Sequence, residues 1–187
     1  MNKRFLFRGL MVAATMLMTT MAWANHGPTD VGGAMMSPNK TIVENAMNSA
    51  DHETLVGAVK AAGLVETLQG PGPFTVFAPV DSAFNELPTG TVPTLLDPAN
   101  VDKLRAVLTY HVISGNMTHA DLEKAVMQGG GMTTLTTVNG ATLTVKQNGN
   151  NLVLVDQAGR MANISVYDVA QSNGVIHVID KVLLPHK

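Results

Sequence analysis

The period of the hydrophobic residues changes part-way along this chain, and no other feature constrains the fold as strongly. Between residues 42 and 126 most apolar positions recur at helical spacing, as Leu104, Val107 and Leu108 do. In residues 141–146 apolar and polar residues alternate instead, which is typical of a half-buried strand. Helices followed by antiparallel strands indicate an α+β domain.

Two short apolar segments are expected to form buried strands. Residues 74–78 lie between two prolines, and residues 175–184 place apolar side chains on both faces of an extended chain. The second segment should therefore be central in a sheet and covered on both sides. Hairpin turns are predicted at three dipeptides that tolerate positive φ, namely Asn139-Gly140, Asn148-Gly149 and Asn173-Gly174.

The first 24 residues have the composition of a secretion signal. Three basic residues precede a short apolar run over residues 10–18, and small residues two apart follow at Ala22 and Ala24. The apolar run is too short to cross a bilayer stably, so no transmembrane segment is expected after cleavage. A secreted or periplasmic location is predicted.

Residues 25–37 are rich in Gly, Pro and small polar residues without a period, which predicts a flexible tether, and residues 38–185 would form the domain. If cleavage follows Ala24, the new amino terminus and His26 could hold copper(II) in a square-planar arrangement. A tail with a single histidine is common, so the prediction for the chain is no metal and no cofactor.

Charge and composition exclude several classes of function. The chain has 12 basic and 14 acidic residues, and removing the basic residues of residues 1–24 leaves a net charge of about minus five. A nucleic-acid binder or an anionic-membrane binder needs a basic surface, so neither is expected. The chain has no cysteine, which excludes disulfides, thiol nucleophiles and thiolate metal sites.

Three segments resemble the signatures of the fasciclin family: residues 72–88, 108–113 and 172–185. With the flanking helices and hairpins, the resemblance spans residues 38–185. It implies a wedge-shaped β-sandwich with helices packed against it. It also implies an exported, non-enzymatic binding or cell-adhesion module, whose partner is a protein, another cell-surface macromolecule or a second copy of itself.

The resemblance also implies a candidate partner-binding segment. In animal members the Tyr-His segment has been linked to integrin engagement, and Tyr110 and His111 are the matching residues here. An alternative interpretation is structural, because a polar ring at a helix-to-strand junction is costly without a hydrogen-bond partner. Asp81 is a candidate for that partner of His111.

Six further residues of the signatures are expected to hold the fold together: Phe74, Phe77, Asp81, Phe84, His177 and Asp180. Asp81 stands where the N-cap of a helix belongs. His177 and Asp180 are three apart on an expected strand, so they point to opposite faces and cannot form a dyad. A buried His177 bonded to the backbone is the expectation, and Asp156 and Asp168 are expected to face solvent.

The motifs of common enzymes are missing from the sequence. It contains no Gly-x-Ser-x-Gly, no His-Glu-x-x-His and no phosphate-binding Gly-x-x-x-x-Gly-Lys-Ser/Thr. The chain is therefore predicted to bind rather than to catalyse. An alternative function is the carriage of a small apolar ligand in a cleft of the sandwich, and a hydrolase built on Asp81 or His177 is a third hypothesis.

Overall fold

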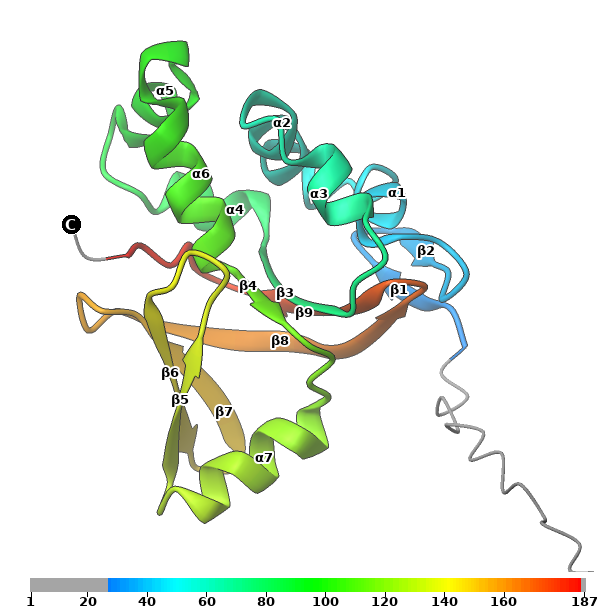
Figure 1. Cartoon of the computed structure of the whole chain (residues 1–187), viewed down its shortest axis with the longest axis vertical. Coiled ribbons are helices and arrows are strands. Elements are labelled where there is room, and N and C mark those ends of the chain that lie inside the picture. The colour runs from blue at the N-terminus through cyan, green and yellow to red at the C-terminus, as the bar shows by residue number, and fades with distance from the viewer. Residues whose placement is uncertain (1–26, 186–187) are drawn as a thin grey trace, which may run out of the picture.

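The computed structural model describes residues 27–185. Within them a seven-stranded sheet has the order β4-β3-β9-β8-β7-β6-β5 (Figure 1). Its strands are β3 (Phe74–Pro79), β4 (Val112–Ser114), β5 (Met132–Thr136), β6 (Thr142–Asn148), β7 (Asn151–Val155), β8 (Met161–Gln171) and β9 (Gly174–Ile179). Neighbouring strands are antiparallel except β3 and β9, which are parallel. The predicted α+β class is confirmed.

The two apolar segments meet at the centre of this sheet. All six residues of β9 are buried, and β9 lies between β3 and β8. Phe77 of β3 pairs with His177 of β9, and Pro79 pairs with Ile179. Phe77 and Ile179 are both wholly buried. The prediction of a central strand covered on both faces is confirmed.

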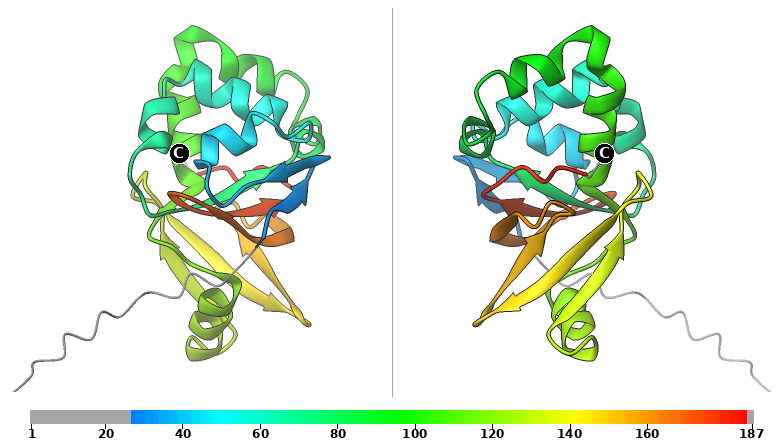
Figure 2. Two further views of the ribbon diagram at one scale, coloured as in Figure 1. Left: turned by 90° about the vertical axis from the view of Figure 1, so that its right-hand side faces the viewer. Right: turned by 90° about the vertical axis from the view of Figure 1, so that its left-hand side faces the viewer.

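Strand β8 joins two halves of the sheet that face in different directions (Figure 2). Its pairing with β9 is irregular at two places, between Ile164 and Val166 and between Val166 and Val169. Such bulges bend a strand and increase its twist. Because of the bend, Leu143 and Leu154 of the second half pack in one cluster with Phe77 of the first.

The helices divide into two groups (Figures 1 and 2). One group packs over the half of the sheet that contains β3 and β9: α1 (Ile42–Ala46), α2 (Glu53–Ala61), α3 (Val65–Gln69), α4 (Asp81–Asn85), α5 (Thr91–Leu96), the 3₁₀ turn Pro98–Asn100 and α6 (Val101–Tyr110). Helix α7 (His119–Gln128) lies apart and packs against β5 and β6. Its buried residues Leu122 and Val126 pack in the cluster that contains Phe77, Leu143 and Leu154.

The prediction of a flexible tether over residues 25–37 is wrong for residues 29–36. These residues form a hairpin of β1 (Thr29–Val31) and β2 (Ala34–Met36). Gly32 and Gly33 both have positive φ, which allows the tight turn. Val31 and Met36 are buried in the same cluster as α1, so this hairpin belongs to the domain.

Residues 1–26 lie outside the described part of the chain, and the predicted signal peptide and the hypothetical His26 site lie there. Within residues 27–185 no helix is both long enough and apolar enough to span a membrane.

Candidate functional site

The Tyr110-His111 segment lies in the interior, at the point where α6 ends. The Tyr110 side chain is wholly buried, and its hydroxyl donates to the carbonyl of Thr142 over 2.8 Å. His111 is the C-cap of α6 and is 3% exposed. A partner cannot reach either side chain in this conformation, so the expectation that they contact a partner directly does not fit the structure.

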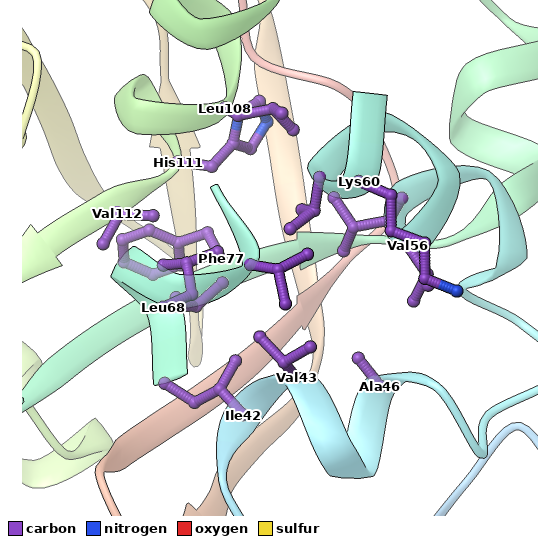
Figure 3. A pocket seen from close by; sticks show the side chains of 14 residues that line it. Ile42, Val43, Ala46, Val56, Lys60, Leu68, Phe77, Leu108, His111 and Val112 are labelled. Atoms are coloured by element: carbon purple, nitrogen blue, oxygen red, sulfur yellow. The ribbon is translucent and has the colours of Figure 1, made fainter. Parts of the chain in front are cut away.

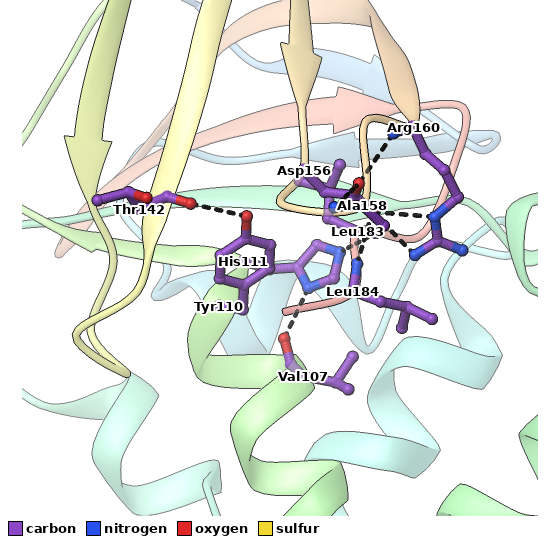
Figure 4. A network of polar contacts seen from close by, with 9 residues as sticks. All are labelled: Val107, Tyr110, His111, Thr142, Asp156, Ala158, Arg160, Leu183 and Leu184. Carbon is purple, nitrogen blue, oxygen red and sulfur yellow. Dashed lines mark hydrogen bonds and ion pairs between the residues drawn. The ribbon is translucent and has the colours of Figure 1, made fainter. Parts of the chain in front are cut away.

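His111 links the end of α6 to the carboxy-terminal segment. Its Nε2 accepts from the N–H of Leu183 over 3.0 Å, so the ring proton lies on Nδ1, which donates to the carbonyl of Val107 over 2.8 Å (Figure 4). Burial lowers the pKa of His111 to about 4. The ring is therefore neutral at pH 7. Asp81, a candidate partner of His111, bonds instead to the backbone of Glu53 and Thr54.

Beside His111 the carboxylate of Asp156 is completely buried and accepts five hydrogen bonds (Figure 4). One oxygen accepts from the backbone N–H groups of Ala158 and Arg160. The other accepts from Nε and Nη2 of Arg160 and from the N–H of Leu184. The expectation that Asp156 faces solvent is therefore wrong. The carboxylate joins the β7–β8 turn to the carboxy-terminal segment.

A groove of about 250 Å³ lies next to this network. It is lined by Ala83, Glu86, Leu87, Arg160, Met161, Lys181, Val182 and Leu183. Met161 is 56% exposed, which makes it an apolar contact available to a partner. Lys181 lies 3.6 Å from Glu86, and both side chains are about half exposed, so this ion pair contributes little to stability. The lining of the groove combines apolar side chains with two cations, Arg160 and Lys181, and one carboxylate, Glu86.

Hydrogen bonds to buried side chains hold two of the residues that line this groove. Arg160 is bonded to Asp156 through two nitrogens, and Leu183 donates to His111. A preformed surface loses less conformational entropy on binding than a mobile one. His111 therefore positions Leu183, one of the residues that line the groove.

Asp81 has a different role from the predicted one. Val80 is the N-cap of α4, and Asp81 is the first residue of that helix. Its carboxylate accepts from the N–H groups of Glu53 and Thr54, at 3.2 and 2.8 Å. These are the first residues of α2, whose own N-cap makes no side-chain hydrogen bond. Asp81 thus caps a helix distant in sequence and ties α4 to α2.

His177 is also in the interior and contacts backbone groups. Its Nδ1 accepts from the N–H of Asp168, and its Nε2 donates to the carbonyl of Met117 over 2.9 Å. The ring stacks on Phe77, and burial lowers its pKa. Asp180 instead accepts from the backbone N–H and the side-chain amide of Asn163, both at 2.7 Å. The two residues form no dyad.

Two other predicted structural residues, Phe74 and Phe84, are partly buried and pack against the cluster of α1 and α2. Sequence reasoning missed Asp168 as a structural residue. It has a φ of 56° at the irregular part of β8, and its carboxylate accepts from the N–H of His119 at the start of α7. A positive φ on a non-glycine residue is not visible in a sequence pattern.

Sequence reasoning also missed Arg160 and Met161. The signal for Arg160 was the turn Asp156-Gln-Ala-Gly-Arg160, in which an aspartate can bond the backbone two residues later. Nothing in the sequence showed that this turn lies against residues 182–184.

A second, smaller pocket lies between the helices and the sheet (Figure 3). Its volume is about 40 Å³, and its lining is apolar except for Lys60 and His111. Sites for drug-sized ligands usually measure about 300–1,000 Å³. The pocket is therefore too small for such a ligand unless the helices move apart. Among residues 27–185 no three His, Asp or Glu side chains are grouped to hold a metal ion.

Comparisons with known proteins agree with the architecture. Residues 50–185 match the fasciclin domain. The chain is 44% identical to protein sll1483 of Synechocystis over 90% of this chain and 88% of that protein. It is 32% identical to the immunogenic protein MPT70 of Mycobacterium tuberculosis, over 85% of this chain and 75% of that protein.

Two further comparisons extend these findings. The cell surface glycolipoprotein MPT83 of Mycobacterium tuberculosis is 34% identical over 85% of this chain and 66% of its own length. Among solved structures, a FAS1 domain pair of the insect cell adhesion molecule fasciclin I matches with a TM-score of 0.62 and 23% identity. This match covers 79% of the chain and 52% of that two-domain structure, and it shows a shared fold. The chain belongs to the fasciclin family, whose members are adhesion and surface proteins.

Proposed function

We propose that this protein is an exported, non-enzymatic module that binds a protein or another cell-surface macromolecule through the groove beside the Tyr110-His111 segment. The observation that carries the proposal is the groove itself. A half-exposed methionine lies in the groove with two cations, and bonds to buried side chains hold Arg160 and Leu183 in place. Such a surface suits a partner that offers an apolar side chain next to an acidic group.

Catalysis would need a different arrangement. The histidines of the signatures are buried, neutral at pH 7 by the direction of their pKa shifts, and bonded to backbone groups. A general base must instead be free to take a proton from a substrate within hydrogen-bond distance. These side chains support a structural role, which agrees with a binding module.

Two independent observations support a location outside the cytoplasm. The composition of residues 1–24 predicts export, and relatives include a protein named as a cell surface glycolipoprotein. We propose that the protein works in the periplasm or at the cell surface.

Binding of labelled protein to intact host cells or their matrix tests the role of the groove. Met161→Glu places a negative charge on the groove and should weaken binding at least about tenfold, since it removes an apolar contact and repels an acidic partner. Met127→Glu is the matched control, because Met127 is 67% exposed on α7, outside the groove. Binding that both variants retain equally would refute the groove as the contact surface.

The carrier alternative makes a separate prediction. Native mass spectrometry of protein from its host would show an added apolar ligand if the pocket between helices and sheet opens. A mass equal to that of the polypeptide alone would count against a carrier.

A further inference from the structure

Strands β5 and β4 form the two edges of the seven-stranded sheet, and the two edges differ. The opposite edge strand, β4, has three residues, two of them buried, and its Val112 carbonyl accepts from the N–H of Val138. Strand β5 has five residues, and alternate ones are exposed. The bond between Val138 and Val112 brings the two edges together at one end, and β5 is the longer of the two edge strands.

The hydrogen bonds on either side of β5 show which backbone groups face outward. The N–H of Thr137 donates to Ala141, and the carbonyl of Gly131 accepts from Gln147, so odd-numbered residues bond toward β6. The N–H of Val138 bonds in the other direction, to Val112. By the alternation of an antiparallel ladder, the groups of even-numbered residues in β5 point away from β6.

Two of these even-numbered residues have backbone groups that are free to bond to another strand. The carbonyl of Met132 lies against Gly129, where a Cβ atom would be only 1.9 Å from it. Val138 already donates to β4. Thr134 and Thr136 remain, and each offers one N–H and one carbonyl that have no ladder partner among the described strands.

The sequence of β5 has none of the residue types that usually keep an edge strand from pairing with another strand. Residues 132–138, Met-Thr-Thr-Leu-Thr-Thr-Val, contain no charged residue and no proline. Proteins usually protect open edges with lysine, proline or a bulge. Threonine and valine also favour strand structure. The edge is suited to accept a strand.

We propose that the strand is β5 of a second copy of this chain, paired antiparallel about a two-fold axis at Leu135. In this register Thr134 lies opposite Thr136 of the second copy, and the two such pairs use all four free groups of each strand in four hydrogen bonds. Centring the axis on Thr134 would instead place Thr136 opposite Met132, whose carbonyl lies against Gly129, and would leave some of these groups unpaired. A two-fold axis also closes the assembly as a dimer.

The side chains are self-complementary in the same register. Met132, 50% exposed, and Val138, 45% exposed, lie at the two ends of the paired segment, and Val138 stays bonded to β4 of its own chain. The half-buried Leu135 side chains meet at the axis on the other face. Apolar and threonine cross-strand pairs stabilise antiparallel strands. No charges oppose each other on the strands themselves.

The interface of the proposed dimer is small, so the fraction of protein that dimerises should depend on its concentration. One pair of five-residue strands buries less surface than a standard protein interface. Pairing would nevertheless present two recognition grooves together, which raises avidity for a surface-bound partner. The dimer does not depend on the groove, because none of the groove residues lies in residues 132–138.

Sedimentation equilibrium of the exported protein, up to about 1 mM, tests the dimer. In the variant Thr134→Lys/Thr136→Lys, two lysines oppose each other in both pairs, and the dissociation constant should rise at least about tenfold. In Thr134→Lys/Thr136→Glu, each lysine opposes a glutamate of the second copy. This variant should dimerise at least as well as the wild type, more strongly at low salt.

Both variants change the same two exposed positions, so circular dichroism and thermal unfolding serve as checks that the fold is unchanged. The wild type remaining monomeric at the highest concentration would overturn the proposal, as would a dimer that the Lys/Lys variant does not weaken. A Lys/Glu variant as weak as the Lys/Lys variant would exclude the register centred on Leu135. Met161→Glu should leave the dimer intact, which separates this test from that of the groove.

Discussion

The burial of His111 predicts that this protein loses stability in mild acid. The pKa of the ring is about 4 in the folded state, because burial disfavours the charged form, and about 6.5 in an unfolded chain. Between these values the unfolded state binds more protons than the folded state. The free energy of unfolding therefore falls as the pH falls from about 6.5 to about 4.

The size of the effect follows from the two pKa values. Between pH 7.5 and pH 4.5, His111 alone lowers the free energy of unfolding by roughly 2.5 kcal/mol. His52 and His177 have pKa values that burial also lowers, and they act in the same direction. The total change is thus larger than the part from His111, and a variant is needed to isolate that part.

The variant His111→Gln removes the titrating ring and keeps a side chain that can donate and accept. At pH 7.5 it should be less stable than the wild type by about 1–3 kcal/mol, since the hydrogen bonds to Val107 and Leu183 lose their geometry. At pH 4.5 this difference should disappear or reverse. Urea unfolding at a series of pH values between these limits measures both quantities.

Tyr110→Phe is the control for this experiment. It deletes the hydrogen bond to Thr142 but leaves the ring of His111 in place, so the protein should lose about 1 kcal/mol at every pH. A His111→Gln variant whose stability depends on pH as steeply as that of the wild type would refute the reasoning. It would show that the ring is charged, or reached by water, in the folded state.

Three further substitutions test how the signatures hold the fold, with urea unfolding as the measurement in each case. Asn173→Ala removes buried hydrogen bonds to the carbonyls of Leu68 and Gly70 and from the N–H of Ile42, and should cost about 3 kcal/mol. Gly174→Ala would place a Cβ atom 2.0 Å from the carbonyl oxygen of Phe74, and should destabilise the protein more than any surface substitution. Asp81→Ala should cost about 1 kcal/mol because it removes the cap of α2. A variant in which α4 is lost while α2 stays intact would contradict this role of Asp81.

The central strands were predictable because their sequences have no polar face. Residues 74–78 and 175–179 are apolar on both sides, and only the middle of a sheet can bury both sides of a strand. The turns near Asn139, Asn148 and Asn173 were predictable for a local reason, since each Asn-Gly pair interrupts the strand pattern, although of these residues Gly140 and Gly149, and no asparagine, provide the positive φ in the turns.

The amino-terminal hairpin was not predictable from composition. Glycines and small polar residues over residues 27–34 resemble a linker, yet Gly32 and Gly33 form a turn that brings Val31 and Met36 into the core. Whether a glycine pair is a hinge or a turn depends on whether an apolar surface lies within reach of its neighbours.

The candidate site was the least predictable part. The sequence places Asp81 before a helix, but its carboxylate bonds to the start of a different helix. It places Asp156 in a turn, but the carboxylate is buried by Arg160 and the backbone of Leu184. Asp81 and Glu53 are far apart in the chain, and so are Asp156 and Leu184. No local sequence pattern shows such contacts.

By itself the sequence determined the α+β class, the two interlocking strands, the hairpin turns and the family. These features depend on hydrophobic periodicity and backbone preference, which act over a few residues. Only the tertiary structure decided that Tyr110 and His111 lie inside, that Met161 lines a groove and that β5 lies at an edge of the sheet. Exposure and hydrogen-bond partners depend on which distant segments pack together, and that information is not contained in any local stretch of the chain.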